Sequence, residues 1–331
     1  MSRILLALSL STCLTSGTAL AEVPRVAVDI APVHSLVARV MQGVGAPDLI
    51  VQQGGSPHEY SLRPSEAAAL QDAELVFWIG PELTPWLEDT IGTLAALATV
   101  TSLLEADGTL VLELREDALF ESHGHGDHEE HGDHEEHGDL EIHDDHAEHD
   151  DEDHDHEGHA HAARDPHAWL SPQNAATWLN VIAAQLSAAD PDNAGTYFAN
   201  AAAAIVETDA LIADLDATLA PVRNGRYIVF HDAYQYFEVA FDLPAAGAIS
   251  LSDASDPSPA RIGEIQARIA AEGIDCVLAE PQFNAGLVAT VLDGTRAATG
   301  LLDPLGSDLA PGPALYPQLL RNLSATLRGC L

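Results

Sequence analysis

Three histidines in this chain have the chemistry and the positions expected of metal ligands. His58 lies in a Gly- and Ser-rich loop, His167 follows an Asp-Pro pair, and His231 directly follows an apolar run at 227–230. A single histidine is usually a structural residue, but three at loop or strand-end positions are hard to explain separately. Neutral imidazole is a favoured ligand of Zn²⁺. The three residues together therefore predict a zinc site.

Alternating strands and helices are expected to position these histidines. Apolar runs typical of buried strands occur at 26–30, 49–51, 75–80, 227–230, 276–279 and 301–302. Helical periodicity covers 174–186 and then a long stretch that ends at Pro221 and would span roughly 40 Å. The pattern predicts an α/β fold with two βα domains on either side of a long connecting helix. Open parallel sheets bind ligands at the carboxyl ends of their strands, where the histidines are expected.

A different kind of segment runs from Glu121 to His161. It contains 13 of the 17 histidines and 18 acidic residues, and it has no Lys or Arg. Because it has few apolar residues, it cannot bury enough surface to offset the entropy cost of folding, so we expect a disordered loop. Its composition favours weak capture of several Zn²⁺ ions, and a solvated linker is the alternative.

The first residues have the pattern of a signal peptide. Arg3 precedes an apolar run at 4–14, and small residues at 19 and 21 suit a cleavage site. The run is shorter than the roughly 20 residues of a membrane-spanning helix. We expect cleavage after Ala21 and an exported, soluble mature protein that starts at Glu22. The formal net charge of −39 disfavours nucleic acid as a partner and attracts cations.

Cleavage at that point removes Cys13 and leaves Cys276 and Cys330. Two cysteines in an exported protein are most simply explained by a disulfide. This disulfide would tie the end of the chain to the strand expected at 276–279. Two free, buried thiols are the alternative. His34, the remaining histidine outside the tract, is expected to be a structural residue at the start of a helix.

Five motifs in order resemble those of the metal-specific, cluster A-I substrate-binding proteins of ABC transporters. They are Gly54 to Ser65, Asp165 to Trp169, Phe230 to Tyr234, Ala279 to Phe283 and Leu302 to Gly306. The His- and acid-rich tract is located where zinc-uptake (ZnuA-type) members have theirs. The resemblance implies two βα sandwich domains joined by a long rigid connecting helix, with the metal site in the interdomain cleft.

The same resemblance implies a division of the chain and a function. A signal peptide at 1–21 precedes a first metal-binding domain at 22–190, which contains the tract. A connecting helix at 191–221 leads to a second metal-binding domain at 222–331. The implied protein captures periplasmic Zn²⁺ with high affinity and delivers it to the membrane permease of an ABC-type zinc importer. A periplasmic zinc chaperone is a further candidate partner.

By this resemblance His58, His167 and His231 are the metal ligands. Asp303 matches a carboxylate ligand of manganese-binding members, so it is the candidate fourth ligand, with water or a tract residue as alternatives. Some zinc members use a Glu just before the first histidine, but Pro57 occupies that position here. Manganese members tend to have Glu in place of His231, so three imidazoles favour Zn²⁺.

Different classes of protein share parts of this pattern. Three histidines with an open position are also the ligands of hydrolytic zinc enzymes and carbonic anhydrases. Glu59 or Glu280 would have to act as base, and the sequence has no HExxH motif. We therefore expect a binding protein and not an enzyme. Within binding proteins, a manganese or iron carrier and a copper- or nickel-sequestering protein compete with the zinc interpretation.

Overall fold

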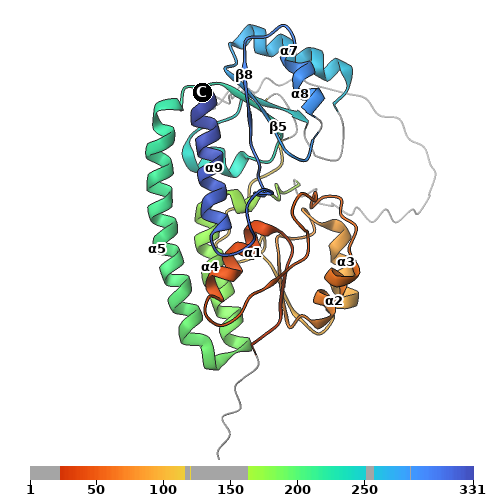
Figure 1. Cartoon of the computed structure of the whole chain (residues 1–331), viewed down its shortest axis with the longest axis vertical. Helices are drawn as coiled ribbons and strands as arrows, with labels where there is room; N and C mark the ends of the chain where they lie inside the picture. The colour runs from red at the N-terminus through yellow and green to blue at the C-terminus, as the bar shows by residue number, and fades with distance from the viewer. Residues whose placement is uncertain (1–22, 116–119, 121–162, 251–256, 284) are drawn as a thin grey trace, which may run out of the picture.

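The computed structural model describes residues 23–115, 120, 163–250, 257–283 and 285–331. The predicted signal peptide at 1–21 and the histidine-rich tract at 121–161 lie outside the described residues. Figure 1 shows two halves, one above the other, with the long helix α5 (Ala194–Leu219) running beside both.

The first half contains a parallel sheet of four strands in the order β2-β1-β3-β4. The strands are β1 (Val26–Val28), β2 (Asp48–Leu49), β3 (Leu75–Trp78) and β4 (Thr99–Ser102). The helices that connect them are α1 (Ala31–Val40), α2 (Pro64–Asp72) and α3 (Pro85–Leu94). Each begins with a proline in its first turn, where the missing N–H costs nothing.

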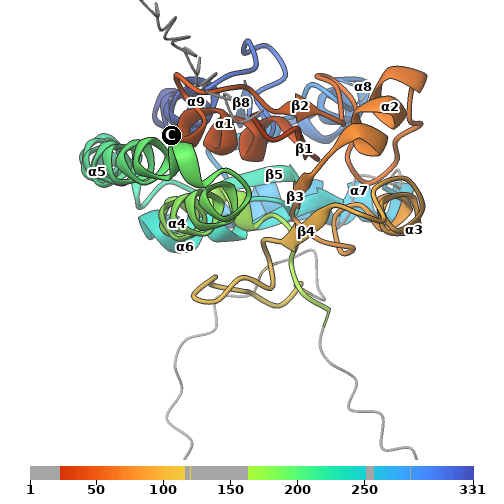
Figure 2. The ribbon, with the colours of Figure 1, turned by 90° about the horizontal axis from the view of Figure 1, so that it is seen from below.

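Helices cover both faces of this first sheet. Val26 and Val28 pack in one cluster with residues of α1, whereas Ala27 packs in another with residues of α2 and α3. This alternation is what a central strand of a two-sided sheet requires. Figure 2 shows α1 and α3 on either side of β1 and β3.

The second half repeats the topology, with strand order β6-β5-β7-β8 and all neighbours parallel. Its strands are β5 (Tyr227–His231), β6 (Gly247–Ser250), β7 (Cys276–Ala279) and β8 (Ala298–Leu301). Its helices are α6 (Gln235–Phe241), α7 (Pro259–Glu272), α8 (Ala285–Leu292) and α9 (Leu315–Cys330). The predicted fold, two parallel-sheet α/β domains with a long helix between, is confirmed.

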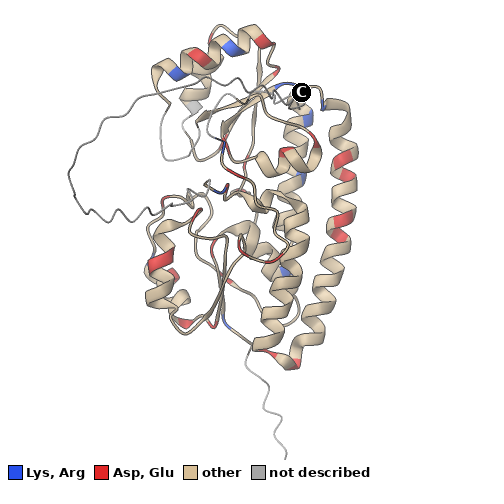
Figure 3. Cartoon of the chain, turned by 180° about the vertical axis from the view of Figure 1, so that it is seen from behind, with Lys and Arg blue, Asp and Glu red and all other residues tan. Residues whose placement is uncertain are grey.

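Two long helices support both halves. The chain passes through a 3₁₀ turn at Ala168–Leu170 into α4 (Pro172–Ala189), then through a second at Pro191–Asn193 into α5, and a third at Ala220–Val222 follows. The 26 residues of α5 correspond to about 39 Å. Its inner face is buried, and its acidic residues lie on the outer face (Figure 3). None of the helices among the described residues is both long enough and apolar enough to cross a bilayer.

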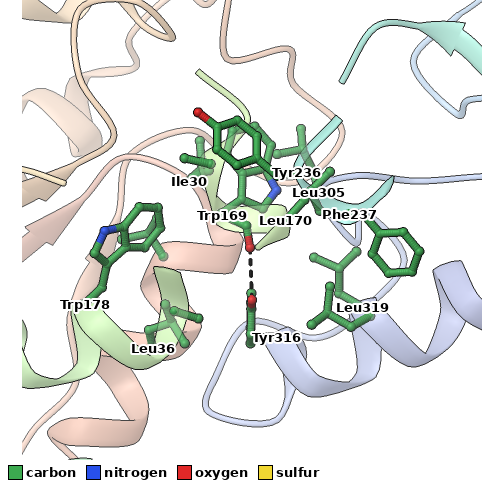
Figure 4. Packing of buried hydrophobic residues seen from close by; sticks show 14 of the residues in the cluster. Ile30, Leu36, Trp169, Leu170, Trp178, Tyr236, Phe237, Leu305, Tyr316 and Leu319 are labelled. Atoms are coloured by element: carbon green, nitrogen blue, oxygen red, sulfur yellow. Dashed lines mark hydrogen bonds between the residues drawn. The ribbon is translucent and has the colours of Figure 1, made fainter. Parts of the chain in front are cut away.

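The last helix, α9, joins the two halves through Tyr316. The Tyr316 hydroxyl donates to the carbonyl of Trp169 at 3.0 Å, as Figure 4 shows, and the Tyr316 N–H donates to Ser35 at 2.9 Å. Trp169 in turn donates from its indole to the carbonyl of Pro304 at 2.8 Å. Residues of both halves therefore share one hydrophobic core.

The predicted disulfide is confirmed. Cys276 in β7 and Cys330 at the end of α9 are bonded, with their Cα atoms 5.8 Å apart. The bond holds α9 against the second sheet.

Candidate metal centre

The three predicted histidines come together from distant parts of the chain. His58 lies in the loop between β2 and α2, His167 lies directly before the 3₁₀ turn at 168–170, and His231 ends β5. Their ring centroids are 5.3 to 6.5 Å apart, and one ligand atom of each lies within 4.8 Å of the other two. Within the described part of the chain, these histidines are the one group of three or more His, Cys, Asp or Glu side chains close enough together to hold a metal ion.

The spacing of this group suits a tetrahedral ion. Zn–N bonds of about 2.0–2.1 Å place ligand nitrogens roughly 3.4 Å apart. The rings therefore need to approach one another by no more than about 1.4 Å, a movement within reach of side-chain adjustment or slight closure of the two halves. His167 and His231 are almost completely buried, and His58 is partly exposed.

Buried carboxylates orient two of the rings. The Nδ1 atom of His167 donates to Asp165 at 2.7 Å, and Nδ1 of His231 donates to Glu280 at 2.7 Å. Each carboxylate also accepts the backbone N–H of the same histidine. With the proton fixed on Nδ1, the lone pair of Nε2 remains to bind an ion, as in many zinc proteins.

The topology explains why Glu280 reaches His231. β5 and β7 are neighbouring strands on either side of the point where the strand order reverses, and Glu280 directly follows β7. Ligand sites in open parallel sheets occur at this switch point. At the switch point of the first half, Asp29 directly follows β1, and its carboxylate accepts the N–H groups of Ile30 and of Ile79, the residue after β3.

The site is rich in buried acidic groups. Burial raises the pKa of Asp165 and of Asp232 to about 7, although Arg115 and the histidines act in the opposite direction. Burial also raises the pKa of Glu280 and of Glu238. Carboxylates whose charged form is disfavoured in this way create a strong local preference for a cation.

The histidines line a small cavity with mainly apolar walls. Its volume of about 20 Å³ has room for one ion or water. The lining consists of Ser56, Pro57, His58, His167, Trp169, His231, Glu280, Gln282, Phe283, Pro304 and Leu305. Phe283 stacks on Phe230 at 4.0 Å and lies 5.5 Å from the ring of His231. These apolar contacts limit water and strengthen electrostatic interactions inside the cavity.

Asp303, the candidate fourth ligand, has its own partners. Its carboxylate accepts hydrogen bonds from the N–H groups of Leu305, Gly306 and Ser307, and from the Ser307 hydroxyl, at 2.6 to 3.0 Å. It does not belong to the group of ligand atoms around His58, His167 and His231. The structure thus brings three of the four predicted site residues together.

Sequence reasoning misses the roles of Asp165 and Glu280. Both lie within the motifs that resemble the metal-binding family, and the sequence suggested for Glu280 only the role of a base in an enzyme. The signal for Asp165 is its spacing two residues before His167. His34 is in the first turn of α1 and donates from Nε2 to the carbonyl of Pro47 at 3.1 Å, as expected for a structural residue.

Two parallel-sheet domains joined by a long helix, with histidines of both meeting in one cavity, define a substrate-binding protein for a metal ion. The chain belongs to the family of the zinc-uptake complex component A, periplasmic, whose model matches residues 26–330.

Comparison with known proteins supports this family. The chain is 48% identical over 316 residues to the high-affinity zinc uptake system protein ZnuA of Brucella abortus, covering 95% of this chain and 94% of that protein. It is 46% identical over 331 residues to the protein of the same name from Paracoccus denitrificans, covering 100% and 98%.

Solved structures share the fold. A crystal structure of ZnuA matches with a TM-score of 0.71 and 22% identity, over 93% of this chain and 99% of that one. A ZnuA deletion mutant lacking 138–173, with zinc bound, matches with a TM-score of 0.70 and 22% identity, over 93% and 98%. At this identity the structural likeness concerns the fold alone.

Proposed function

We propose that this chain binds one Zn²⁺ through His58, His167 and His231 and delivers it to the membrane permease of an ABC-type zinc importer. The observation that supports the proposal most directly is the convergence of three imidazoles, two of them held by buried carboxylates. Membership of a zinc-uptake family points to the same ion. Three neutral nitrogen ligands suit Zn²⁺ better than the harder Mn²⁺ ion, which prefers carboxylate and water oxygens.

Both halves contribute to the proposed site. His58 and His167 come from segments of the first half, and His231 ends a strand of the second. Binding therefore stabilises one relative position of the two halves, and release to a permease requires that they separate slightly. In this proposal the chain has no catalytic role. The boundaries 22–190, 191–221 and 222–331 and export by a cleaved signal peptide at 1–21 belong to the same proposal.

The histidine-rich tract at 121–161 is proposed as an auxiliary, weaker zinc-capture site. The described residues that flank it support this role because they lie beside the cavity. Glu113 and Arg164 form a backbone bridge across the two ends, and the Leu112 N–H donates to the hydroxyl of Tyr236. That hydroxyl donates to the carbonyl of Asp165. Ions held near these ends would be at a raised local concentration for the cavity.

Metal analysis of the mature protein tests the proposed function. Elemental analysis after purification without added metal, followed by competition among Zn²⁺, Mn²⁺, Cu²⁺ and Ni²⁺ against a chromophoric chelator, identifies the preferred ion. We expect one tightly held Zn²⁺. Preference for Mn²⁺, or retention of zinc after His231→Ala, would contradict the proposal. A periplasmic zinc chaperone, as a further proposed partner, is tested by following transfer of zinc from it to the metal-free chain.

A further inference from the structure

Gln282 lies in the metal cavity without an assigned role. It lines the same cavity as His58, His167 and His231. It lies in a turn in which the N–H of Phe283 donates to the carbonyl of Glu280 at 3.3 Å. Since Glu280 holds His231 and Phe283 stacks on Phe230, residues on both sides of Gln282 are fixed by the site itself.

The amide group of Gln282 is buried and lacks a protein partner. Both Nε2 and Oε1 are shielded from solvent, and neither has a hydrogen-bond partner within the described part of the chain. A buried amide without partners carries a free-energy cost, so such a group in a ligand cavity points to a bound species that completes its hydrogen bonds.

Several polar groups near the cavity have partners already. Glu280 accepts the Nδ1 proton of His231, and the indole N–H of Trp169 donates to Pro304. The hydroxyl of Ser56 accepts the N–H of His58 at 3.2 Å. Asp303 is bound to its own turn and does not line this cavity. The amide of Gln282 is thus well placed to interact with the fourth ligand of an ion held by three histidines.

We propose that Gln282 positions a water molecule that is the fourth ligand of the bound zinc ion, an inference that rests on the proposed function. A metal-bound water donates two hydrogen bonds, and the Oε1 atom of Gln282 is an acceptor that can take one. The cavity volume of about 20 Å³ has room for one such water, with the ion held among the histidine nitrogens that line the cavity. Direct coordination by the amide is disfavoured, because zinc in proteins is bound mainly by Cys, His, Asp and Glu.

Three variants test this role: Gln282→Leu, Gln282→Glu and the control Gln318→Leu, on the exposed side of α9. Zinc affinity is measured by chelator competition, and the coordination by the visible absorption of Co²⁺-substituted protein as a function of pH. We expect Gln282→Leu to weaken zinc binding by roughly 10-fold, as for residues elsewhere that act through a ligand. The Co²⁺ spectrum should remain that of a four-coordinate ion.

Gln282→Glu places a negative charge next to the bound water. The carboxylate should raise the pH at which that water loses its proton, and so the pH midpoint of the Co²⁺ spectral change. Gln318→Leu should match the wild type in both measurements.

The inference is overturned if Gln282→Leu changes neither the zinc affinity nor the Co²⁺ spectrum. It is also overturned if this variant loses as much affinity as His231→Ala with a changed coordination number, which would make Gln282 a direct ligand. Failure of the proposed function would instead appear as absence of tight zinc in the wild type and in Gln318→Leu.

Discussion

Arg115, which is partly exposed, forms an ion pair with the buried carboxylate of Glu238 that joins the two halves of the molecule, with 2.6 Å between Nη2 and Oε2. Arg115 follows β4 of the first half, and Glu238 lies in α6 of the second. The same guanidinium contacts Asp232 at 2.9 Å, and Asp232 is the residue after His231. A planar guanidinium suits this role because it can serve two carboxylates at once. The pair therefore links the geometry of the cavity to the contact between the halves.

Replacement of Arg115 should weaken both stability and zinc retention. Arg115→Met leaves two buried carboxylates without their cation, at a cost of about 3 kcal/mol in the free energy of unfolding. Zinc should also dissociate faster, because Asp232, the residue after His231 at the end of β5, is no longer held by Arg115. Arg115→Lys should have an intermediate effect. Urea unfolding and stopped-flow zinc release measure both quantities.

Arg25→Met is the matched control, since the Arg25–Glu74 pair is about half exposed. Exposed pairs contribute roughly 0–1 kcal/mol. Equal effects of Arg25→Met and Arg115→Met would show that the Arg115–Glu238 pair has no special role.

Loss of the carboxylate that orients His231 should lower zinc affinity without loss of a ligand. Glu280→Gln keeps the size of the side chain but removes its charge, so it accepts the Nδ1 proton more weakly. We expect zinc to bind roughly 10- to 100-fold more weakly. Glu88→Gln on the exposed side of α3 is the control. Isothermal calorimetry with a competing chelator checks the result, and an unchanged dissociation constant for Glu280→Gln would refute the orienting role.

His34 should make the metal-free protein less stable in mild acid. Burial lowers the pKa of His34 below its ordinary value of 6.5, while the carbonyl of Pro47 and the charge of Asp48 act in the opposite direction. Above pH 6.5 both folded and unfolded forms are neutral at this residue. As the pH falls through 6.5, the unfolded chain takes up a proton that the folded chain resists, so stability is lost.

His34→Gln removes this contribution. Between pH 7.5 and 5.5 the wild type should therefore lose more unfolding free energy than the variant, both measured in urea with EDTA. The remaining histidines are common to both proteins and cancel in the comparison. Parallel pH dependence of the two proteins would be inconsistent with this assignment.

Reduction of the disulfide should destabilise the protein. Cys276 and Cys330 are separated by 54 residues in the sequence, and a cross-link over such a loop contributes about 4 kcal/mol in the chain-entropy model. We expect reductant to lower the melting temperature of the wild type. The double variant Cys276→Ser/Cys330→Ser should melt low with or without reductant. A melting temperature that does not respond to reductant in the wild type would contradict the expectation.

Deletion of residues 121–161 should preserve one tight zinc site and remove the weaker ones. The three histidines of the cavity lie outside that span. Calorimetric titration of the deletion variant, joined by a short Gly-Ser linker, should give a stoichiometry near one. Identical total stoichiometry in the two proteins would leave the tract as a linker only.

Much of the architecture was predictable because its signals are local. The runs at 227–230 and 276–279 became strands with nearly the expected bounds, and the long helical period became α5. β4 (Thr99–Ser102) and β6 (Gly247–Ser250) were missed. β4 is a partly exposed edge strand without a continuous apolar run, and Gly247 and Ser250 weaken the apolar signal of β6.

The partners of the site histidines depend on strand order, which sequence patterns do not fix. Glu280 reaches His231 only because β7 pairs with β5, although 49 residues separate them in sequence. Asp303 illustrates the opposite case. The resemblance to manganese-binding members suggested Asp303 as a ligand, but a tight turn provides its carboxylate with backbone donors nearby.

The placement of α9 has a consequence for how the chain acquires its structure. This helix comes late in the sequence, yet the N–H of its Tyr316 donates to Ser35 in α1, 281 residues earlier. The first half thus cannot complete its interior until α9 has been synthesised. Contacts between such distant parts of a sequence slow folding. A chain built in this way cannot finish folding while only its first half has been synthesised.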